Sequence, residues 1–414
     1  MRVLFIHQNF PGQFKHVAPA LAAQGHEVVA LGINKPAYPT PGVKVLLHRP
    51  RAPNPESAKA APDELKELQA KTIRGHSVAR ALTRLRQEGF IPALICVHSG
   101  WGEAFFIKDV FPDVPLLVYA EYFYRSSGGD SDFDPEFSRK TLESLERLRL
   151  KNTHLIHGLL AADRGLSPTR FQRDCHPEVL RDKIEVIHDG IDTKRFVPDA
   201  RAIVSLRKAG LTLRPKDEVV TFVARELEPY RGYHSFMRAL PELLALRPNA
   251  QIVIVGGHGV SYGAPPPVGT TWKDLFLNEV AGRIDRKRVH FVGKLPHALL
   301  TQLMQVSTAH VYLTYPFVVS WSLMEAMSIG CLVVGSRTAP VQEVVEHGRT
   351  GLLVDFFDLS EIASTVADAL ERRTELQDLR KAARQHIVQH YDLKTRCLPA
   401  QLELLQRLAA PDKR

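Results

Sequence analysis

Residues 315–334 read YPFVVSWSLMEAMSIGCLVV, and the order of polar and apolar letters in this stretch decides the expected fold. Ser320, Trp321 and Ser322 open an apolar helix, and an apolar strand follows at residues 331–334. A helix that leads directly into a wholly apolar strand is typical of a parallel sheet covered by helices on both faces. The stretch therefore predicts an α/β fold.

The same alternation of short apolar runs and helical patterns extends along most of the chain. Runs that predict strands stand at residues 3–6, 28–31, 94–97, 116–119, 155–160 and 184–187. The pattern pauses at residues 196–198 and restarts with runs at residues 219–223, 252–255, 289–292, 309–313 and 332–334. We therefore expect two successive doubly wound parallel-sheet domains of the Rossmann-like type.

The predicted domain boundary lies at Pro198. Residues 1–197 form the first domain and residues 198–394 the second. A helix at about 395–414, whose leucines suit one buried stripe, is expected to cross back onto the first domain. Ligands of such sheets bind at the carboxyl ends of the strands, so facing domains predict a central cleft between those two edges.

Composition limits what the protein can do. The 414 residues are 44% hydrophobic and 24% charged, which excludes a disordered chain. A net charge of +9, spread over both halves, favours an anionic substrate or a membrane surface and argues against a nucleic-acid-binding arm. The four cysteines form no CxxC pair, and no apolar run reaches the roughly 18 residues of a membrane span. We therefore expect a cytoplasmic protein without a zinc site or a disulfide framework.

Gly12 lies in the turn after the first predicted strand. A glycine between a strand and a helix lets backbone N–H groups approach a phosphate. A plain tight turn explains Gly12 equally well. The segment has no G-x-G-x-x-G pattern, which argues against a dinucleotide-dependent oxidoreductase.

Arg225 and Arg231 follow the first strand of the second domain, at the edge where a ligand is expected. Guanidinium groups bind phosphate oxygens in a bidentate manner and keep their charge, so the pair predicts a diphosphate site. Ion pairs with Glu226 and Glu228 are the alternative.

Glu325 lies on the apolar helix quoted above, where an unpaired carboxylate is costly. A ribose diol that donates two hydroxyl hydrogens would satisfy it; capping of a neighbouring loop is the alternative. Free N–H groups at Ser320, Trp321 and Ser322 predict a second anion site at the start of this helix.

The chain resembles glycosyltransferase family 4, whose members are retaining nucleotide-sugar transferases with the GT-B fold of two Rossmann-like domains. The matching motifs follow the family's order through most of both domains, and as a set they are specific for the family but not for the sugar. They are residues 11–12 with 25–28, 183–192 with 196 and 198, 225 with 231, 254–257, 289–293, 325–327 with 330, and 343 with 350–354.

The resemblance implies a role for several of these residues. Arg225 and Arg231, the latter where the family usually has lysine, would hold the donor diphosphate, and Glu325 would hold the ribose. The turn at Gly12 would approach the phosphates. No cofactor is implied beyond the nucleoside diphosphate sugar donor, and two arginines with two helix N-termini can stabilise the leaving diphosphate without a metal. The backbone bordering the base would come from Val292 and Gly293.

The sequence departs from the family at two positions. The first glutamate of the family's pair falls at Phe317, which cannot hydrogen-bond a sugar hydroxyl, so recognition of the donor sugar must differ or use backbone at residues 318–320. Many members place a histidine beside the transferred sugar, where this chain has Glu121 nearby. Glu121 could face a developing oxocarbenium ion, and an ion pair with Arg125 is the alternative.

Two further features have both a functional and a structural reading. His98 and Trp101 follow the strand at residues 94–97 and are candidates for the acceptor side of the site; a buried structural histidine and a core tryptophan are the alternatives. The basic segment 71–86 could rest on anionic lipid headgroups, or it could pack its apolar stripe onto the sheet.

These observations predict a retaining, metal-independent glycosyltransferase that moves a sugar from a nucleoside diphosphate to a hydroxyl of a glycan or lipid-linked glycan. The expected partners are that donor and acceptor, with possible contact at the inner face of a membrane and no nucleic acid. A phosphorylase or epimerase of the same fold is the alternative among enzymes. A non-catalytic sugar-nucleotide-binding partner of another transferase is the alternative outside them.

Overall fold

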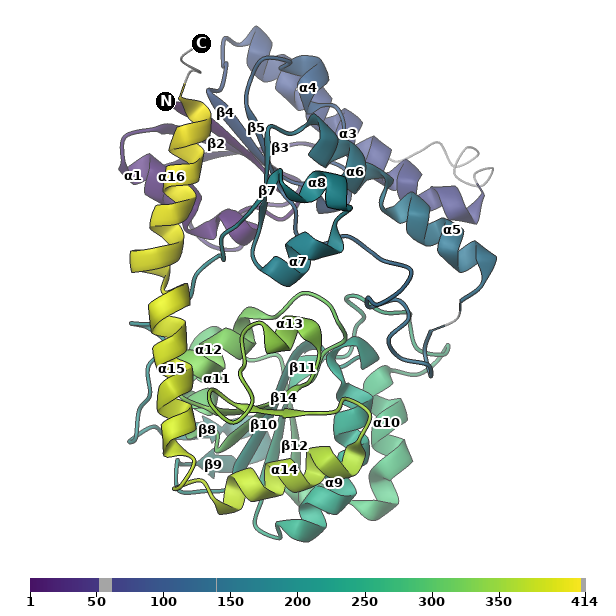
Figure 1. Cartoon of the computed structure of the whole chain (residues 1–414), viewed down its shortest axis with the longest axis vertical. Coiled ribbons are helices and arrows are strands. Elements are labelled where there is room, and N and C mark those ends of the chain that lie inside the picture. The colour runs from purple at the N-terminus through teal and green to yellow at the C-terminus, as the bar shows by residue number, and fades with distance from the viewer. Residues whose placement is uncertain (52–61, 139, 411–414) are drawn as a thin grey trace. The chain divides into compact units, whose positions relative to one another are not determined.

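The computed structural model describes residues 1–51, 62–138 and 140–410, which fall into two units (Figure 1). Unit 1 comprises Met1–Gly190 and Lys394–Arg414, and unit 2 comprises Ile191–Leu393. Each unit is built on a parallel sheet with helices packed against it, so the predicted α/β class with two doubly wound domains is confirmed.

The sheet of unit 1 has seven parallel strands in the order β3-β2-β1-β4-β5-β6-β7. Chain order reverses between β1 and β4, which is the switch point where ligands of such sheets bind. The strands are β1 (Arg2–Ile6), β2 (Glu27–Gly32), β3 (Val43–Leu47), β4 (Leu94–His98), β5 (Leu116–Tyr119), β6 (Arg164–Ser167) and β7 (Ile184–Val186). The helices are α1 (Val17–Ala23), α3 (Asp63–Gln87), α4 (Ile107–Val110), α5 (Leu142–Lys151), α6 (Thr153–Ala161), α7 (Arg170–Cys175), α8 (Glu178–Arg181) and α16 (Leu398–Ala409), with short 3-10 turns η1 (Gly12–Lys15) and η2 (Ser99–Trp101).

The apolar strands of unit 1 bury both faces. In β1, Leu4 and Ile6 point to a core that includes Leu82 of α3, whereas Val3 and Phe5 point to the opposite core, which includes α1 and α16. A strand whose side chains alternate between two cores must be apolar throughout. This is why the runs in the sequence are continuous.

Unit 2 repeats the arrangement with six parallel strands in the order β12-β11-β10-β13-β14-β15, and its switch point lies between β10 and β13. These strands are β10 (Val219–Glu226), β11 (Gln251–Gly257), β12 (Val289–Gly293), β13 (Ala309–Tyr312), β14 (Leu332–Ser336) and β15 (Leu352–Val354), and a separate hairpin pairs β8 (Val204–Leu206) with β9 (Leu211–Leu213). The helices are α9 (Tyr233–Leu246), α10 (Trp272–Val280), α11 (His297–Val306), α12 (Trp321–Ile329), α13 (Ala339–Gln342), α14 (Leu359–Glu371) and α15 (Gln377–Tyr391).

One predicted strand is wrong. The apolar run at residues 155–160 lies in α6, and the strand of this region is β6. Periodicity cannot separate a short buried helix from a buried strand. Leu155, Gly158 and Leu159 are buried at helical spacing, whereas β6 contains Gly165, which left its apolar signal weak.

The division between the units lies at Gly190–Ile191, upstream of the predicted boundary at Pro198. Ile191 and Phe196 pack in the core of unit 2 together with Met327 of α12. The backbone of Ile191 also hydrogen-bonds with Tyr391 and Leu393, at the end of the same unit. The motif that ends at Pro198 therefore starts in unit 1 and finishes inside unit 2.

Two predicted helices have clear packing partners within unit 1. Leu404 and Leu405 of α16 lie in the same core as α1, where the terminal helix was expected to return. Val78 and Leu82 of α3 are fully buried against the sheet, so the apolar stripe of the basic segment 71–86 packs inward. The structural reading of that stripe is correct.

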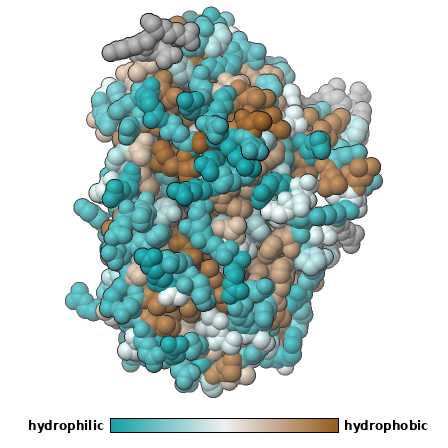
Figure 2. All heavy atoms as spheres, viewed as in Figure 1, coloured by the Kyte–Doolittle hydropathy of each residue, from teal (hydrophilic) through white to brown (hydrophobic). Residues whose placement is uncertain are grey.

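No helix among residues 1–51, 62–138 and 140–410 is both long enough and apolar enough to cross a membrane. Hydrophilic residues make up much of the face drawn in Figure 2, with apolar residues interspersed.

Candidate functional site

The candidate residues gather at the carboxyl edge of each sheet and are described here for each unit in turn. In unit 1, β1 leads to His7, β4 ends at His98, and β5 leads to Glu121. All three positions lie at or next to the switch point of the sheet.

Gly12 has a structural reason to be glycine. Its φ is +47°, and a Cβ built there would lie 2.2 Å from Nε2 of His7, closer than any real contact. The turn therefore packs directly on the His7 ring, which the sequence analysis did not single out. His7 is 3% exposed.

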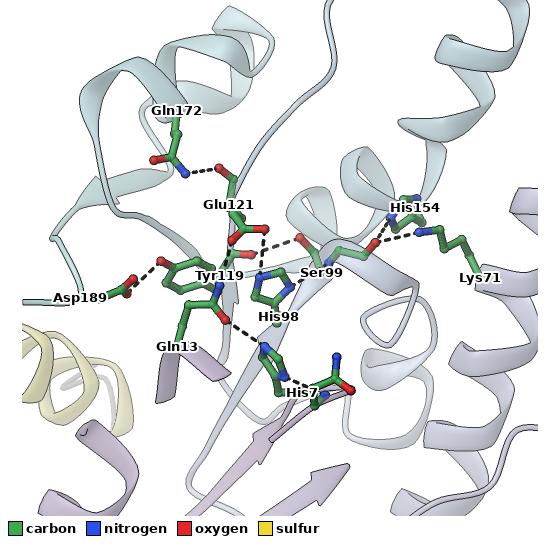
Figure 3. Close-up of polar contacts among 12 residues, drawn as sticks. His7, Gln13, Lys71, His98, Ser99, Tyr119, Glu121, His154, Gln172 and Asp189 are labelled. Atoms are coloured by element: carbon green, nitrogen blue, oxygen red, sulfur yellow. Dashed lines mark hydrogen bonds and ion pairs between the residues drawn. The ribbon is translucent and has the colours of Figure 1, made fainter. Parts of the chain in front are cut away.

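A chain of hydrogen bonds runs from His7 to Glu121 (Figure 3). The N–H of Asn9 donates to Nδ1 of His7 over 2.9 Å, which leaves the ring proton on Nε2. That nitrogen lies 2.9 Å from Oε1 of Gln13, and Nε2 of Gln13 donates to Oε1 of Glu121 over 2.8 Å. The buried His7 thus holds the Glu121 carboxylate in place through Gln13.

His98 holds the other oxygen of Glu121. The N–H of Gly100 donates to Nδ1 of His98 over 3.1 Å, so Nε2 carries the proton and lies 3.6 Å from Oε2 of Glu121. The His98 ring is stacked with Trp101 and Tyr119, at centroid distances of 4.6 and 5.2 Å, and it is fully buried. His98 therefore helps to position Glu121, and its predicted place on the acceptor side stays a prediction. Trp101 is half-buried against it.

The surroundings of Glu121 favour its charged form. Burial raises the pKa of its carboxyl group, but His98, His7 and the hydrogen bond from Gln13 lower it, and the net shift is downward. Burial and the neighbouring His98 lower the pKa of His7 to about 3, so that ring is neutral at physiological pH. Arg125 donates instead to the carbonyl of Gly128, and no ion pair joins it to Glu121 in the described part of unit 1. The predicted ion-pair alternative is therefore wrong.

In unit 2, Arg225 is exposed near the end of β10. Within the described residues, its guanidinium has no hydrogen bond and no ion pair. Glu226, which could have paired with it, is bound by Lys294 and by the N–H of Gly259 at 2.7 Å. Glu228 is fully buried and accepts from backbone N–H groups of residues 261–263. The carboxylates of Glu226 and Glu228 are thus bound mainly by groups other than the guanidinium of Arg225.

Arg231 is placed very differently, since it is only 7% exposed. Its Nη1 donates to the hydroxyl of Tyr312, the hydroxyl of Thr314 and the carbonyl of Val318 over 3.0–3.2 Å. Its guanidinium also lies 5.9 Å from the ring of Phe317. The guanidinium therefore holds the segment after β13 in place, and its predicted contact with a diphosphate stays a prediction.

Phe317 belongs to an aromatic cluster at the position where the family resemblance implies a glutamate. It is 4% exposed, and its ring lies 5.0 Å from that of Tyr262 and 5.5 Å from that of Tyr230. A ring buried in this way gives a sugar hydroxyl no hydrogen-bond partner.

Glu325 has one partner that the sequence analysis missed. Nη2 of Arg195 donates to Nδ1 of His297 over 3.1 Å, which places the ring proton on Nε2. Nε2 of His297 in turn lies 3.1 Å from Oε2 of Glu325. The Glu325 side chain is 13% exposed. One carboxylate oxygen is thus bound to His297, and Oε1 accepts no hydrogen bond from a described residue.

The start of α12 is partly capped by its own residues. Ser320 is the N-cap, and its hydroxyl accepts from the N–H of Ser322 over 3.3 Å, while its own N–H donates to Tyr312 over 2.7 Å. Trp321 and Ser322 are half-buried, as are Val292 and Gly293 at the end of β12. These residues lie at the same edge of the unit 2 sheet as Arg225.

Several residues of the two sites were absent from the sequence analysis. His7 could have been found, because it follows the first strand directly, and His98 was found at the end of the fourth strand. Gln13 and His297 carry no such signal, because only the fold brings them to Glu121 and Glu325.

Two family profiles match the chain, and together they cover most of it. The glycosyl transferase family 4 group matches residues 24–196, and the glycosyl transferases group 1 matches residues 207–386.

Similar proteins include enzymes that act on sugars. Glycogen synthase of Mycobacterium tuberculosis is 25% identical over 432 residues, which cover 95% of this chain and 92% of that protein. D-inositol 3-phosphate glycosyltransferase of Corynebacterium efficiens is 30% identical over 200 residues, 47% of this chain and 45% of that protein.

Solved structures share the fold at low identity. Sucrose-phosphate synthase of Thermosynechococcus elongatus aligns with a TM-score of 0.72 at 18% identity and covers 98% of both chains. HepE of Anabaena, solved in complex with UDP and glucose, aligns with a TM-score of 0.67 at 18% identity, covering 98% of this chain and all of the other.

Proposed function

Since this chain belongs to the group 1 glycosyltransferases of family 4, we propose that it is a retaining enzyme that transfers a sugar from a nucleoside diphosphate sugar to a hydroxyl of a glycan or lipid-linked glycan. One observation carries the site assignment. Arg225 is an exposed cation without a partner among the described residues, at the carboxyl end of β10, where an anionic ligand of such a sheet is expected.

Unit 2 supplies the proposed donor contacts. Oε1 of Glu325 accepts from the ribose hydroxyls, while His297 fixes the other oxygen. Arg225 binds the diphosphate, and the N-terminus of α12 adds its dipole to the same charge. The crystal structure of Anabaena HepE supports a donor of this class, because that protein was solved with UDP-glucose.

The proposed chemistry is a front-face displacement. The bond between the anomeric carbon and the phosphate oxygen breaks, and the acceptor oxygen forms its bond on the same face of the sugar. The departing phosphate oxygen takes the acceptor's proton, so the products are a nucleoside diphosphate and a glycoside with retained configuration. Positive charge builds up on the sugar as the leaving group departs, and a fixed carboxylate stabilises such charge.

We assign that carboxylate to Glu121 of unit 1. It is held in place before any ligand binds, by Gln13 on one oxygen and His98 near the other. Its side chain remains 33% exposed, so it is open to a ligand.

In this mechanism Arg225 and the N-terminus of α12 neutralise the charge of the leaving diphosphate, so the reaction requires no metal or further cofactor. Chelation with EDTA is therefore expected to leave the transfer rate unchanged, and full loss of activity that Mg²⁺ restores would refute this part.

The experiment that tests the function starts with a thermal-shift screen of nucleoside diphosphate sugars, because a ligand of the folded state raises its stability. The sugar that stabilises the chain then serves as donor in a transfer assay, with the anomeric configuration of the product read by NMR. Arg225→Ala is expected to lower transfer by about 100-fold or more, the scale of removing one preorganised charge-stabilising group.

The exposed Arg214 in the same unit provides the matched control, and Arg214→Ala is expected to keep the wild-type rate. Wild-type turnover by Arg225→Ala would overturn the site, and an inverted product would overturn retention.

The buried Phe317 favours a second candidate, a non-catalytic binding partner of another transferase, since the sugar contact implied by the family is missing. Slow release of nucleoside diphosphate by the purified chain would exclude it. Donor binding without hydrolysis or transfer would favour it.

A further inference from the structure

Two histidines of α15 lie side by side without hydrogen-bond partners. His386 and His390 are four residues apart, so they project from the same face of the helix. Their ring centroids lie 4.9 Å apart. Across residues 1–51, 62–138 and 140–410, neither ring makes a hydrogen bond or an ion pair. The chain described here therefore leaves all four ring nitrogens of the pair without a bonding partner.

One of these nitrogens is buried. Nε2 of His386 has no hydrogen-bond partner among the described residues, and a buried polar atom without a partner is costly and needs a physical explanation. The rings of His7 and His98 provide a contrast, since their centroids lie 5.0 Å apart. Backbone N–H groups donate to Nδ1 of both, and each Nε2 lies beside a side-chain oxygen. The pair on α15 has no such arrangement.

The surroundings keep His386 ready to bind a metal ion. Burial lowers the pKa of His386, and the charges of His390 and Arg349 lower it further, whereas Glu346 raises it. The ring is therefore neutral at physiological pH, which is the form of imidazole that binds metals. Glu346 and Arg349 form an exposed ion pair at 2.7 Å. Such a pair is weak in water, so Glu346 is free to turn towards a cation bound nearby.

The histidine pair lies apart from the proposed donor contacts. Glu346 and Arg349, whose charges act on His386, precede β15 and thus stand at the amino edge of the unit 2 sheet, opposite the edge that carries Arg225. Helix α15 packs against α12 (Figure 1). Its Arg384 donates to the carbonyl of Ser328, near the end of α12 and away from its N-terminus.

We propose that His386 and His390 bind a divalent transition-metal ion of the zinc class, through one ring nitrogen each. Imidazole is a preferred ligand of Zn²⁺, Cu²⁺ and Ni²⁺, and two histidines at positions i and i+4 of a helix suit zinc. Two nitrogens on one tetrahedral zinc lie about 3.4 Å apart, and the exposed ring of His390 turns to meet this spacing. Water or Glu346 supplies the remaining ligands.

This site goes beyond the proposed function and does not depend on it. The expectation that the chain lacks a zinc site concerned its cysteines, and a pair of histidines is a separate way to bind the same metals. The transfer reaction needs no metal, so loss of this ion leaves it unchanged.

Calorimetry on the full untagged chain tests the proposal, after treatment with EDTA and dialysis. ZnCl₂ and MgCl₂ are titrated separately. Zn²⁺ is expected to bind about tenfold or more tightly than Mg²⁺, because Mg²⁺ prefers oxygen ligands.

His390→Gln is the decisive variant, because this exposed side chain makes no hydrogen bond with a described residue. It is expected to weaken Zn²⁺ binding by about tenfold or more, since even the loss of a partner that only orients a metal ligand costs about 10- to 100-fold. Combining Gln389→His with His390→Gln keeps the number of histidines but moves one to another face of the helix, and should not restore the affinity. His157→Gln, at an exposed position of α6, is the matched control and should bind Zn²⁺ as the wild type does.

Unchanged Zn²⁺ affinity and stoichiometry in His390→Gln would overturn the proposal, as would wild-type affinity in the combined variant. Equal binding of Mg²⁺ and Zn²⁺ would also overturn it, because oxygen ligands would then explain the site. Binding only at millimolar Zn²⁺, alike in all variants, would mean an adventitious ion only and has the same consequence. Transfer is assayed alongside: His390→Gln should keep the wild-type rate, and an inactive wild-type chain would refute the proposed function alone.

Discussion

The candidate carboxylate of unit 1, Glu121, and the candidate arginine of unit 2, Arg225, are in opposite states. In unit 1, His7, Gln13, Glu121 and His98 form a linked set in which both oxygens of the carboxylate have partners. In unit 2, Arg225 is exposed and has no partner among the described residues.

This contrast between a fixed carboxylate and an exposed guanidinium illustrates two ways in which a side chain can be made ready for a ligand. A carboxylate fixed by buried neighbours needs no reorganisation when charge develops beside it. An exposed guanidinium keeps all its donors for a ligand but must be ordered on binding, which costs side-chain entropy. Under the proposed function, the fixed Glu121 would stabilise a reaction step, and the exposed Arg225 would capture an anionic substrate.

The largest expected effect concerns the fixed carboxylate. Glu121→Gln keeps the size of the side chain and removes its charge, so we expect kcat to fall by about 100- to 1,000-fold while the KM for the donor changes little. Steady-state kinetics measures both constants. Glu143→Gln, on the exposed face of α5, is the control. A donor KM that rises as much as kcat falls would mean that Glu121 binds the ground state instead.

The units should also differ in their response to acid. Burial lowers the pKa of five histidines in unit 1 to about 3 or 4; they are His7, His48, His154, His176 and His188. In unit 2, burial lowers the pKa of His310 to about 4. An unfolded histidine binds its proton near pH 6.5. Below that pH the unfolded state binds more protons than the folded one, so stability is lost as the pH falls from 6.5 towards 3.

Hydrogen exchange followed by mass spectrometry at pH values from 7 to 4 measures the protection of peptides from each unit separately. Peptides of unit 1 should lose protection at a higher pH than peptides of unit 2. His176→Gln should flatten the pH dependence of unit 1, whereas His157→Gln, at an exposed position of α6, should leave it unchanged. Simultaneous loss of protection in both units would contradict the expectation.

A smaller effect distinguishes the two arginines of unit 2. Arg231→Ala removes a guanidinium that bonds three oxygens, and we expect it to lower the free energy of unfolding by about 3 kcal/mol. Arg231→Lys should lose less, because it keeps the charge. Arg225→Ala should stay within about 0.5 kcal/mol of the wild type, as exposed positions usually do. Urea denaturation measures all three, and equal stability of the two alanine variants would contradict the structural role of Arg231.

Much of the fold could be predicted because the central strands of both sheets are buried on two faces and so read as continuous apolar runs. The exception at residues 155–160 has the same origin, since a short buried helix reads in the same way. In the site, strand-end positions indicated Arg225 and His98, and the family resemblance indicated Glu121. Their partners could not be predicted, because Gln13 is 108 residues away from Glu121 in the chain.

The sequence by itself determined the α/β class, the two-domain organisation and the family, since these depend on local apolar patterning and on motifs in a fixed order. Only the tertiary structure decided which candidates are open to a ligand. Arg225 and Arg231 are chemically identical and six positions apart, but one is exposed and the other is bound beneath an aromatic cluster. The physical reason is that exposure and hydrogen-bond partners depend on which distant segments pack beside a residue, and no local pattern encodes that.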